Sequence, residues 1–375
     1  PMLKAVLYKI WSRPLILTVF LLICLAQPVS VSLHHQENMR QLCEYYNAWG
    51  GPMDDDWKQS IAAQYERLWP QPPKTAEDLQ NASLEQQAVL TAWQYTEFTA
   101  MLDRFVLAQE SAYGEAAKHA YVKLRAASEH GALIFGASPA GTTMANQYQI
   151  GWEFLLFMIL LCVDLFSGEA EAGMVPMQAV SRQGRRRLFR TKLLACQCSA
   201  GIVWCALNLT YAGALTVCYG WGNLKSVVQD FQFNACPYPW NTGIYLFVTL
   251  LTGLLAAQAT ALVIFLLARI GGSTRRTFAL MGGIMTLPYL LAFMTNNQWL
   301  ALWLPCLINN QWLWNSLWLL MLRGYGVPLY ALAGTELAAV CVLAAVMIYR
   351  LAVRAEYVES LERHDKRRIE DESRI

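Results

Sequence analysis

The stretch that decides the fold is TGIYLFVTLLTGLLAAQATALVIFLLA, which runs from Thr242 to Ala268 without a charged residue. A helix of about 20 mainly apolar residues is long enough to cross a hydrocarbon core of roughly 30 Å. Arg269 follows the stretch directly, and Arg275 and Arg276 come soon after it. Positive charge collects on the cytoplasmic side of membrane proteins. This pattern therefore predicts a membrane-spanning helix that ends in the cytoplasm.

The composition of the whole chain agrees with this expectation. Of its 375 residues, 55% are hydrophobic and only 15% are charged, whereas a soluble domain carries about 25% charged residues. The net charge of +2 excludes little, because the placement of the charges matters more than their sum. The chain is expected to be a polytopic membrane protein.

Further apolar runs predict six membrane-spanning helices in all. They cover residues 14–33, 150–166, 193–219, 242–268, 277–295 and 328–349. Basic residues alternate along the connections: the predicted inner segments are rich in them, while the outer loops after the third and fifth spans carry only Lys225 and Arg323. This alternation predicts a multi-pass protein of the cell (cytoplasmic) membrane with both termini in the cytoplasm.

The spans divide the chain into four parts. Residues 1–33 hold the N-terminus and first span, 34–149 an extracytoplasmic domain, 150–349 the remaining spans, and 350–375 a charged cytoplasmic tail. The extracytoplasmic part has 14 acidic and 8 basic side chains. Ser83 to Gln86 fits a capping box, and apolar residues then recur on one helical face, at Phe98, Met101, Leu102, Phe105 and Val106. This domain is therefore expected to be mostly helical.

The outer segment 296–323 is rich in tryptophan and contains Asn-Asn-Gln-Trp twice. Tryptophan favours the interface between membrane and water. One extra span here would put the next positive cluster on the wrong side of the membrane. A pair of short re-entrant helices keeps the topology, with Pro305 and Asn309-Asn310 supplying the turn. The fold expected is thus all-α, with six spans, a helical external domain and re-entrant helices between the fifth and sixth spans.

The connection between the second and third spans, residues 168–192, is the most basic stretch of the chain. Its cations could simply hold the loop inside and touch anionic lipid headgroups. Their spacing supports a second interpretation. Gly173 follows Glu169 by four residues, and a short apolar run, a serine, basic residues and a lysine entering the third span come after it: Met174, Met177, Val180, Ser181, Arg185, Arg186, Arg187 and Lys192.

This order resembles the cytoplasmic segment of ABC transporter permeases of the type-2 exporter family. The resemblance in sequence covers about 25 residues, and the six spans, cytoplasmic termini and re-entrant helices are similar in topology. Pro176 within the short helix and Met174 after the glycine depart from the family pattern. The resemblance implies that this segment docks on nucleotide-binding ABC ATPase subunits and that a second permease chain, identical or different, completes the membrane part.

The chain itself has no phosphate-binding GxxxxGK[ST] motif, because Gly-Lys never occurs in it. It is therefore not expected to be an enzyme, and no cofactor is expected in this chain. The resemblance implies that ATP and Mg²⁺ bind the partner ATPase. No metal site is expected, since His34, His35 and Glu37 read better as polar residues beside the membrane. Membrane lipid is an expected partner and nucleic acid is not.

Two carboxylates within the predicted spans, Glu153 and Glu336, are candidates for a substrate path, because intramembrane charges are costly and commonly functional. For Glu336 the alternative is a hydrogen-bonded acid at a helix interface, or an acid that desolvation keeps protonated. Cys218 and Cys236 flank one outer loop and form a possible disulfide, which spacing alone leaves open.

Three functions remain at this point. The first is the permease of an ATP-driven transporter that exports or extracts a lipid, hydrophobic peptide or antimicrobial compound. The second is a membrane sensor whose external domain binds a ligand, although only a short tail is left for cytoplasmic output. The third, an intramembrane enzyme, is the weakest, because all five histidines lie outside the predicted spans.

Overall fold

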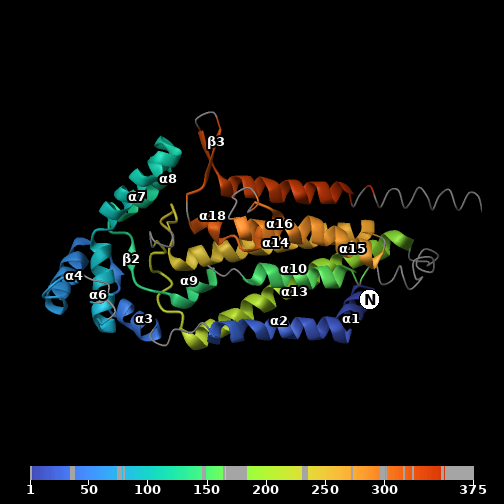
Figure 1. Ribbon diagram of the computed structural model, residues 1–375, viewed down its shortest axis with the longest axis horizontal. Coiled ribbons are helices and arrows are strands. Elements are labelled where there is room, and N and C mark those ends of the chain that lie inside the picture. The colour runs from blue at the N-terminus through green and yellow to red at the C-terminus, as the bar shows by residue number, and fades with distance from the viewer. Residues whose placement is uncertain are drawn as a thin grey trace, which may run out of the picture.

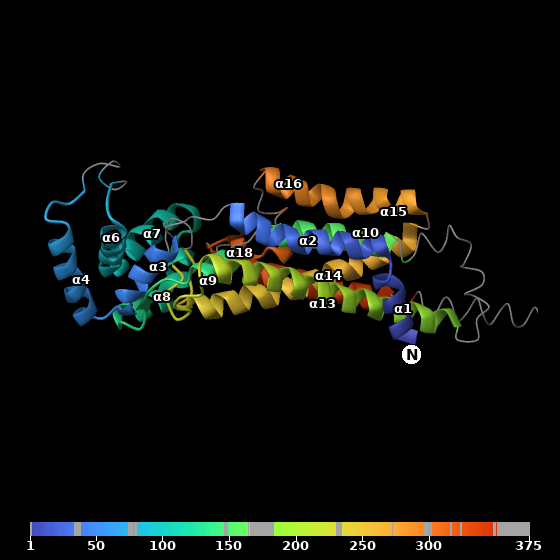
Figure 2. The ribbon, with the colours of Figure 1, turned by 90° about the horizontal axis from the view of Figure 1, so that it is seen from below.

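The computed structural model describes residues 2–33, 39–73, 81–145, 149–163, 184–229, 235–271, 273–295, 302–315, 317–322 and 325–347, with single positions 78, 165, 300 and 350 between or beyond them. The molecule is elongated: long helices form a bundle, and a smaller helical unit covers one end of it (Figures 1 and 2).

Long helices of the bundle follow one another in alternating directions (Figure 1). Four helices are long and apolar enough to cross a membrane: α2 (Pro14–Leu33), α13 (Gly184–Cys218, with the apolar part from Arg187), α14 (Thr242–Gly271) and the helix Leu329–Met347. Among the described residues, this confirms the expectation of an α-helical chain with membrane-length helices.

Two other predicted spans differ from a simple long helix. The second is α10 (Gln149–Val163), whose 15 residues extend only about 22 Å at 1.5 Å per residue. The fifth is divided into α15 (Thr274–Met281), a π-helical turn (Gly282–Thr286) and α16 (Leu287–Thr295). Gly282 and Gly283 are conformationally free and disfavour a regular α-helix. The π-helical turn begins at these two residues.

The core of the bundle lies around α10. Phe154, Phe157, Met158 and Leu161 of this helix are almost completely buried, and a helix that is apolar on all sides is expected in such a position. Small residues of α14, such as Ala256, let neighbouring helices approach closely. At the N-terminus, α1 (Met2–Trp11) packs on this core through Trp11, whose ring stacks on Phe157.

The smaller unit contains α3 (Met39–Ala48), α4 (Asp55–Leu68), α6 (Leu84–Thr96), α7 (Phe98–Tyr113), α8 (Glu115–Glu129), and β1 (Gly51–Pro52) paired with β2 (Ile134–Phe135). The short α9 (Pro139–Ala145) leads from it to the bundle. The capping box at Ser83 is present, and Phe98 and Leu102 point into the core of the unit as predicted. Gly114, whose φ is +56°, ends α7 and separates it from α8.

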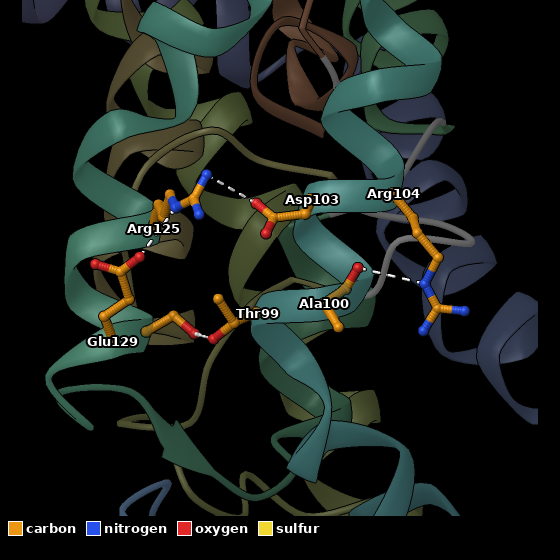
Figure 3. A network of polar contacts seen from close by, with 7 residues as sticks. Thr99, Ala100, Asp103, Arg104, Arg125 and Glu129 are labelled. Carbon is orange, nitrogen blue, oxygen red and sulfur yellow. Dashed lines mark hydrogen bonds and ion pairs between the residues drawn. The ribbon is translucent and has the colours of Figure 1, made fainter.

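Polar side chains join α7 to α8 on the surface (Figure 3). Arg125 forms ion pairs with Asp103 at 3.0 Å and with Glu129 at 2.9 Å, and Thr99 and Ser128 share a hydrogen bond of 2.7 Å. The Glu129 hydrogen bond and the Asp103 charge raise the pKa of the Arg125 guanidinium above its usual value. Exposed pairs of this kind contribute little to stability, so this network supports the packing of two helices rather than a binding site.

The predicted outer segment holds two short helical pieces, a 3₁₀ turn (Leu304–Ile308) and α18 (Gln311–Asn315), and their re-entrant placement stays a prediction. An antiparallel hairpin, β3 (Leu319–Leu322) with β4 (Tyr325–Pro328), follows them and was not predicted. The hairpin packs beside α8, since a Cβ added at Gly326 would lie 3.0 Å from the Ala116 side chain. The described chain is therefore not purely α-helical.

Candidate functional site

Most of the predicted coupling segment lies outside the described residues. This applies to Glu169, Gly173, Met174, Met177, Val180 and Ser181. The basic residues that follow them belong to the first turns of α13, so the helix begins well before the predicted position 193. Arginine and leucine are good helix formers, which explains the early start. The backbone of Arg185 and Arg186 is helical, and Arg187 and Arg190 are exposed at this end.

Lys192 is the member of this group with the clearest contact. It is buried, and its ammonium donates a hydrogen bond of 3.2 Å to the backbone carbonyl oxygen of Leu165, just beyond the end of α10. Carbonyl groups at a helix C-terminus lack helical donors and carry partial negative charge. The lysine therefore fixes the beginning of α13 beside the end of α10, at the end of the bundle away from the smaller helical unit (Figure 1).

Glu153 lies near the other end of α10, where it meets α2. The side-chain amide nitrogen of Gln27 donates a hydrogen bond to the Glu153 carboxylate. Gln27 is completely buried, and its amide oxygen has no hydrogen-bond partner. The next residue, Pro28, lies inside α2 and has no N–H to donate. Among the described residues, the Gln27 amide is therefore the hydrogen-bond donor that α2 gives to Glu153.

A third element reaches the same place from the outer segment. The Asn309 side-chain oxygen accepts a hydrogen bond of 3.1 Å from the Gly151 N–H, and its amide nitrogen donates at 3.3 Å to the Tyr289 hydroxyl. The glycine lets Asn309 approach α10 closely, because a Cβ added at position 151 would lie 2.7 Å from the Asn309 side-chain amide. The Trp152 and Tyr289 rings stack with centroids 6.0 Å apart. The residues Gln27, Gly151, Trp152, Glu153, Tyr289 and Asn309 are called the outer polar cluster below.

Glu336, the second candidate, lies on the helix Leu329–Met347 and is half-buried. It makes no hydrogen bond or ion pair with the residues that the structure describes. It is close enough to act electrostatically on Cys306, while Tyr289 lies within electrostatic range of both Cys306 and Glu153. The two carboxylates therefore border the 304–309 segment, Glu153 from α10 and Glu336 from the last helix.

An apolar groove of about 460 Å³ lies between α14, the outer segment and the last helix. Most of its lining is aliphatic, but three amide side chains also line it: Gln197, Gln258 and Asn310. The Gln197 amide nitrogen has no hydrogen-bond partner. Sequence patterns gave no indication of this groove, because its walls come from helices far apart in the chain.

The smaller helical unit is attached to the loop between α13 and α14 by buried hydrogen bonds. The Tyr121 hydroxyl donates at 2.6 Å to the Ala235 carbonyl oxygen, and Tyr95 donates at 2.7 Å to that of Gln229. Burial raises the pKa of Tyr121 above its usual value. These links were missed in the sequence, since a tyrosine in an amphipathic helix carries no sign of its distant partner.

All ten cysteines are free thiols in the structure. Cys218, at the end of α13, packs in one apolar cluster, and Cys236, in the following loop, is buried in another. Burial raises the pKa of the Cys236 thiol to about 12, which disfavours the reactive thiolate. Their pairing stays a prediction.

Among the described residues, no group of His, Cys, Asp and Glu side chains could hold a metal ion. Comparison of the chain with protein-family models, with curated proteins and with solved structures found no match. The function is therefore argued from the chain's own residues.

Proposed function

We propose that the chain is the membrane permease subunit of an ATP-driven ABC transporter that exports or extracts an apolar molecule. In this proposal α10 and the interrupted helix α15–α16 are spans as well, which brings the number to six, and both termini lie in the cytoplasm of a cell-membrane protein. The 304–315 segment is then re-entrant. Nucleotide-binding subunits on the cytoplasmic side supply ATP hydrolysis.

One observation supports this proposal most directly: the hydrogen bond from Lys192 to the Leu165 carbonyl oxygen. It holds the end of α10 and the start of α13 together, on either side of the basic connection. A partner that engaged the connection would move both helices as one body. A change of state in the ATPase reaches the membrane only if the permease binds its two states differently, and a rigid connection between helices is suited to transmit that difference.

In the proposal, the path of the cargo lies at the other end of the bundle. Glu153 and Glu336 border the outer segment, and the apolar groove lies beside the last helix. The last helix exposes large apolar side chains such as Val342 and Leu343. In the proposal such faces contact lipid or a second permease chain, as a homodimer or heterodimer.

Co-purification tests the proposal. The protein is isolated from its native membrane with its neighbours, and the bound proteins are identified by mass spectrometry. The triple variant Arg185→Glu, Arg186→Glu, Arg187→Glu should lose an ATPase subunit that the unchanged protein retains. The matched control is Arg269→Glu, Arg275→Glu, Arg276→Glu, which reverses three charges in another predicted inner loop and should keep the subunit.

The sensor interpretation has one observation in its favour, because Tyr95 and Tyr121 join the smaller helical unit directly to the loop that precedes α14. A ligand on that unit could alter the bundle through these bonds. If no ATPase co-purifies with either the unchanged protein or the control, the permease proposal fails and the sensor becomes the better hypothesis.

A further inference from the structure

The outer polar cluster has an excess of hydrogen-bond acceptors. Glu153 receives a hydrogen bond from Gln27, and it forms no ion pair with any residue in the described part of the chain. The Gln27 amide oxygen is completely buried without a donor. Buried polar atoms are nearly always paired in native proteins, so an acceptor of this kind beside a carboxylate indicates a missing donor.

One aromatic ring, that of Tyr289, lies within electrostatic range of the same carboxylate. Trp152 adjoins Glu153 in the chain, and its ring stacks on Tyr289 of α16. Aromatic faces attract cations, and tryptophan does so most strongly. Trp152 is 38% exposed and Leu156, one helical turn beyond, is 42% exposed. This side of α10 is therefore open to the outside of the bundle at Trp152 and Leu156.

We propose that this cluster binds a primary ammonium group carried by an apolar molecule. An ammonium has three N–H donors and a positive charge. The donors fit the Glu153 carboxylate and the Gln27 amide oxygen, and the charge fits the Tyr289 ring near them. The proposal rests on the proposed function, since it names the chemical class of the cargo.

Other ligands fit the same groups less well. A quaternary ammonium has no N–H to give to Gln27, and an alcohol would leave the Glu153 charge uncompensated. Calcium takes six to eight oxygen ligands, more than these side chains supply. The ammonium could belong to an aminophospholipid headgroup or to a free amphiphile such as a cationic peptide, and both present the same chemistry to the cluster.

Binding to the full-length protein in lipid nanodiscs tests the proposal. The nanodiscs contain phosphatidylglycerol only, and dodecylamine is titrated while tryptophan fluorescence is recorded. Dodecyltrimethylammonium and dodecanol serve as ligand controls. The amine should bind at least about tenfold more tightly than either control, and Glu153→Gln should weaken it by about tenfold or more. Gln27→Leu should also weaken it, and Glu66→Gln, which removes an exposed acid in α4, should not.

A second arm identifies the source of the amine. Phosphatidylethanolamine is added to the nanodiscs in place of part of the phosphatidylglycerol. Competition with dodecylamine assigns the site to a lipid headgroup, while no competition assigns it to a free amphiphile. Size-exclusion profiles confirm that each variant is folded.

The proposal is overturned if dodecylamine binds no better than dodecanol, or if Glu153→Gln binds it unchanged. Co-purification of the ATPase is measured separately. If the ATPase is retained but the amine does not bind, the permease proposal is kept and the proposed ligand class is rejected. If the amine binds through Glu153 but no ATPase is found, the ammonium site is kept and the permease proposal is rejected.

Discussion

The ammonium of Lys192 lies 3.2 Å from the backbone carbonyl oxygen of Leu165, so that a buried charge joins the start of one long helix to the end of another. A buried ammonium is costly unless it is well bonded. The helix C-terminus offers a carbonyl oxygen and partial negative charge to it. The same lysine was singled out in the sequence for its place at the entrance of a predicted span.

Replacement of Lys192 by methionine tests this link. Lys192→Met keeps the apolar stem but leaves the Leu165 carbonyl oxygen without its donor, which is expected to cost about 1–3 kcal/mol. The midpoint of thermal unfolding in detergent should fall. Lys225→Met, at an exposed position in the α13–α14 loop, should change it little. Equal midpoints for the two variants would show that the bond does not hold the helices together.

Stability at alkaline pH depends on Tyr121. Burial raises its pKa in the folded protein, whereas an unfolded tyrosine has a pKa of about 10. The protonated hydroxyl therefore stabilises the fold fully below about pH 10, and this contribution is lost as the pH rises further, by up to about 1.4 kcal/mol per pH unit. Thermal unfolding measured between pH 8 and pH 11 should show this decline.

Tyr121→Phe removes both the hydroxyl and its bond to Ala235. This variant should be less stable at pH 8 by about 1 kcal/mol, and it should lose less stability than the unchanged protein as the pH rises above 10. Tyr65→Phe is the matched control, since the Tyr65 ring stacks on Trp93 and its hydroxyl makes no hydrogen bond with the described residues. A Tyr121→Phe curve parallel to the unchanged one would refute the role of this hydroxyl.

The turn after α13 provides a comparison between two glycines. Gly220 and Gly222 have φ angles of +73° and +60°, but only Gly222 is crowded: an added Cβ would lie 2.3 Å from the Ala137 carbonyl oxygen. Gly220→Ala should cost about 1–2 kcal/mol for the left-handed backbone. Gly222→Ala should cost clearly more, because a backbone oxygen cannot move aside. Chemical denaturation measures both, and equal losses would contradict the close packing of this turn on Ala137.

The sequence was most informative where one physical rule acted alone. The first long helix, Pro14–Leu33, has the predicted bounds. An uncharged apolar run of this length between polar flanks is typical of a membrane-length helix, so the flanks mark its ends. The capping box at Ser83 was equally local. The hairpin Leu319–Pro328 was missed because tryptophan and leucine suit both a membrane helix and a strand, and periodicity cannot separate these in a short run.

The candidate site was predicted less completely. Glu153 was found because a carboxylate in an apolar helix is conspicuous. Its partners were not, since Gln27, Tyr289 and Asn309 come from three other parts of the chain, and only packing brings them together.

The outer polar cluster depends on Asn309, and this leads to the last prediction. Asn309→Leu keeps a similar volume but removes the acceptor of the Gly151 N–H and the donor to the Tyr289 hydroxyl. Each buried group left unpaired costs about 1–3 kcal/mol, so the free energy of unfolding should fall by about that amount for each lost bond. Tyr289 should also become more mobile beside Glu153, and the quenching of Trp152 fluorescence by a membrane-dissolved quencher should increase.

The control for this prediction is Asn223→Leu. Asn223 also bonds through its side chain, accepting at 3.0 Å from the Lys225 N–H, but that bond is exposed in the α13–α14 loop, where water can replace it. Its replacement should cost less than 1 kcal/mol and leave the quenching of Trp152 unchanged, because it does not contact the cluster. If Asn309→Leu proves as stable as this control, the outer segment is held by its apolar contacts, and the Asn309 hydrogen bonds only orient it.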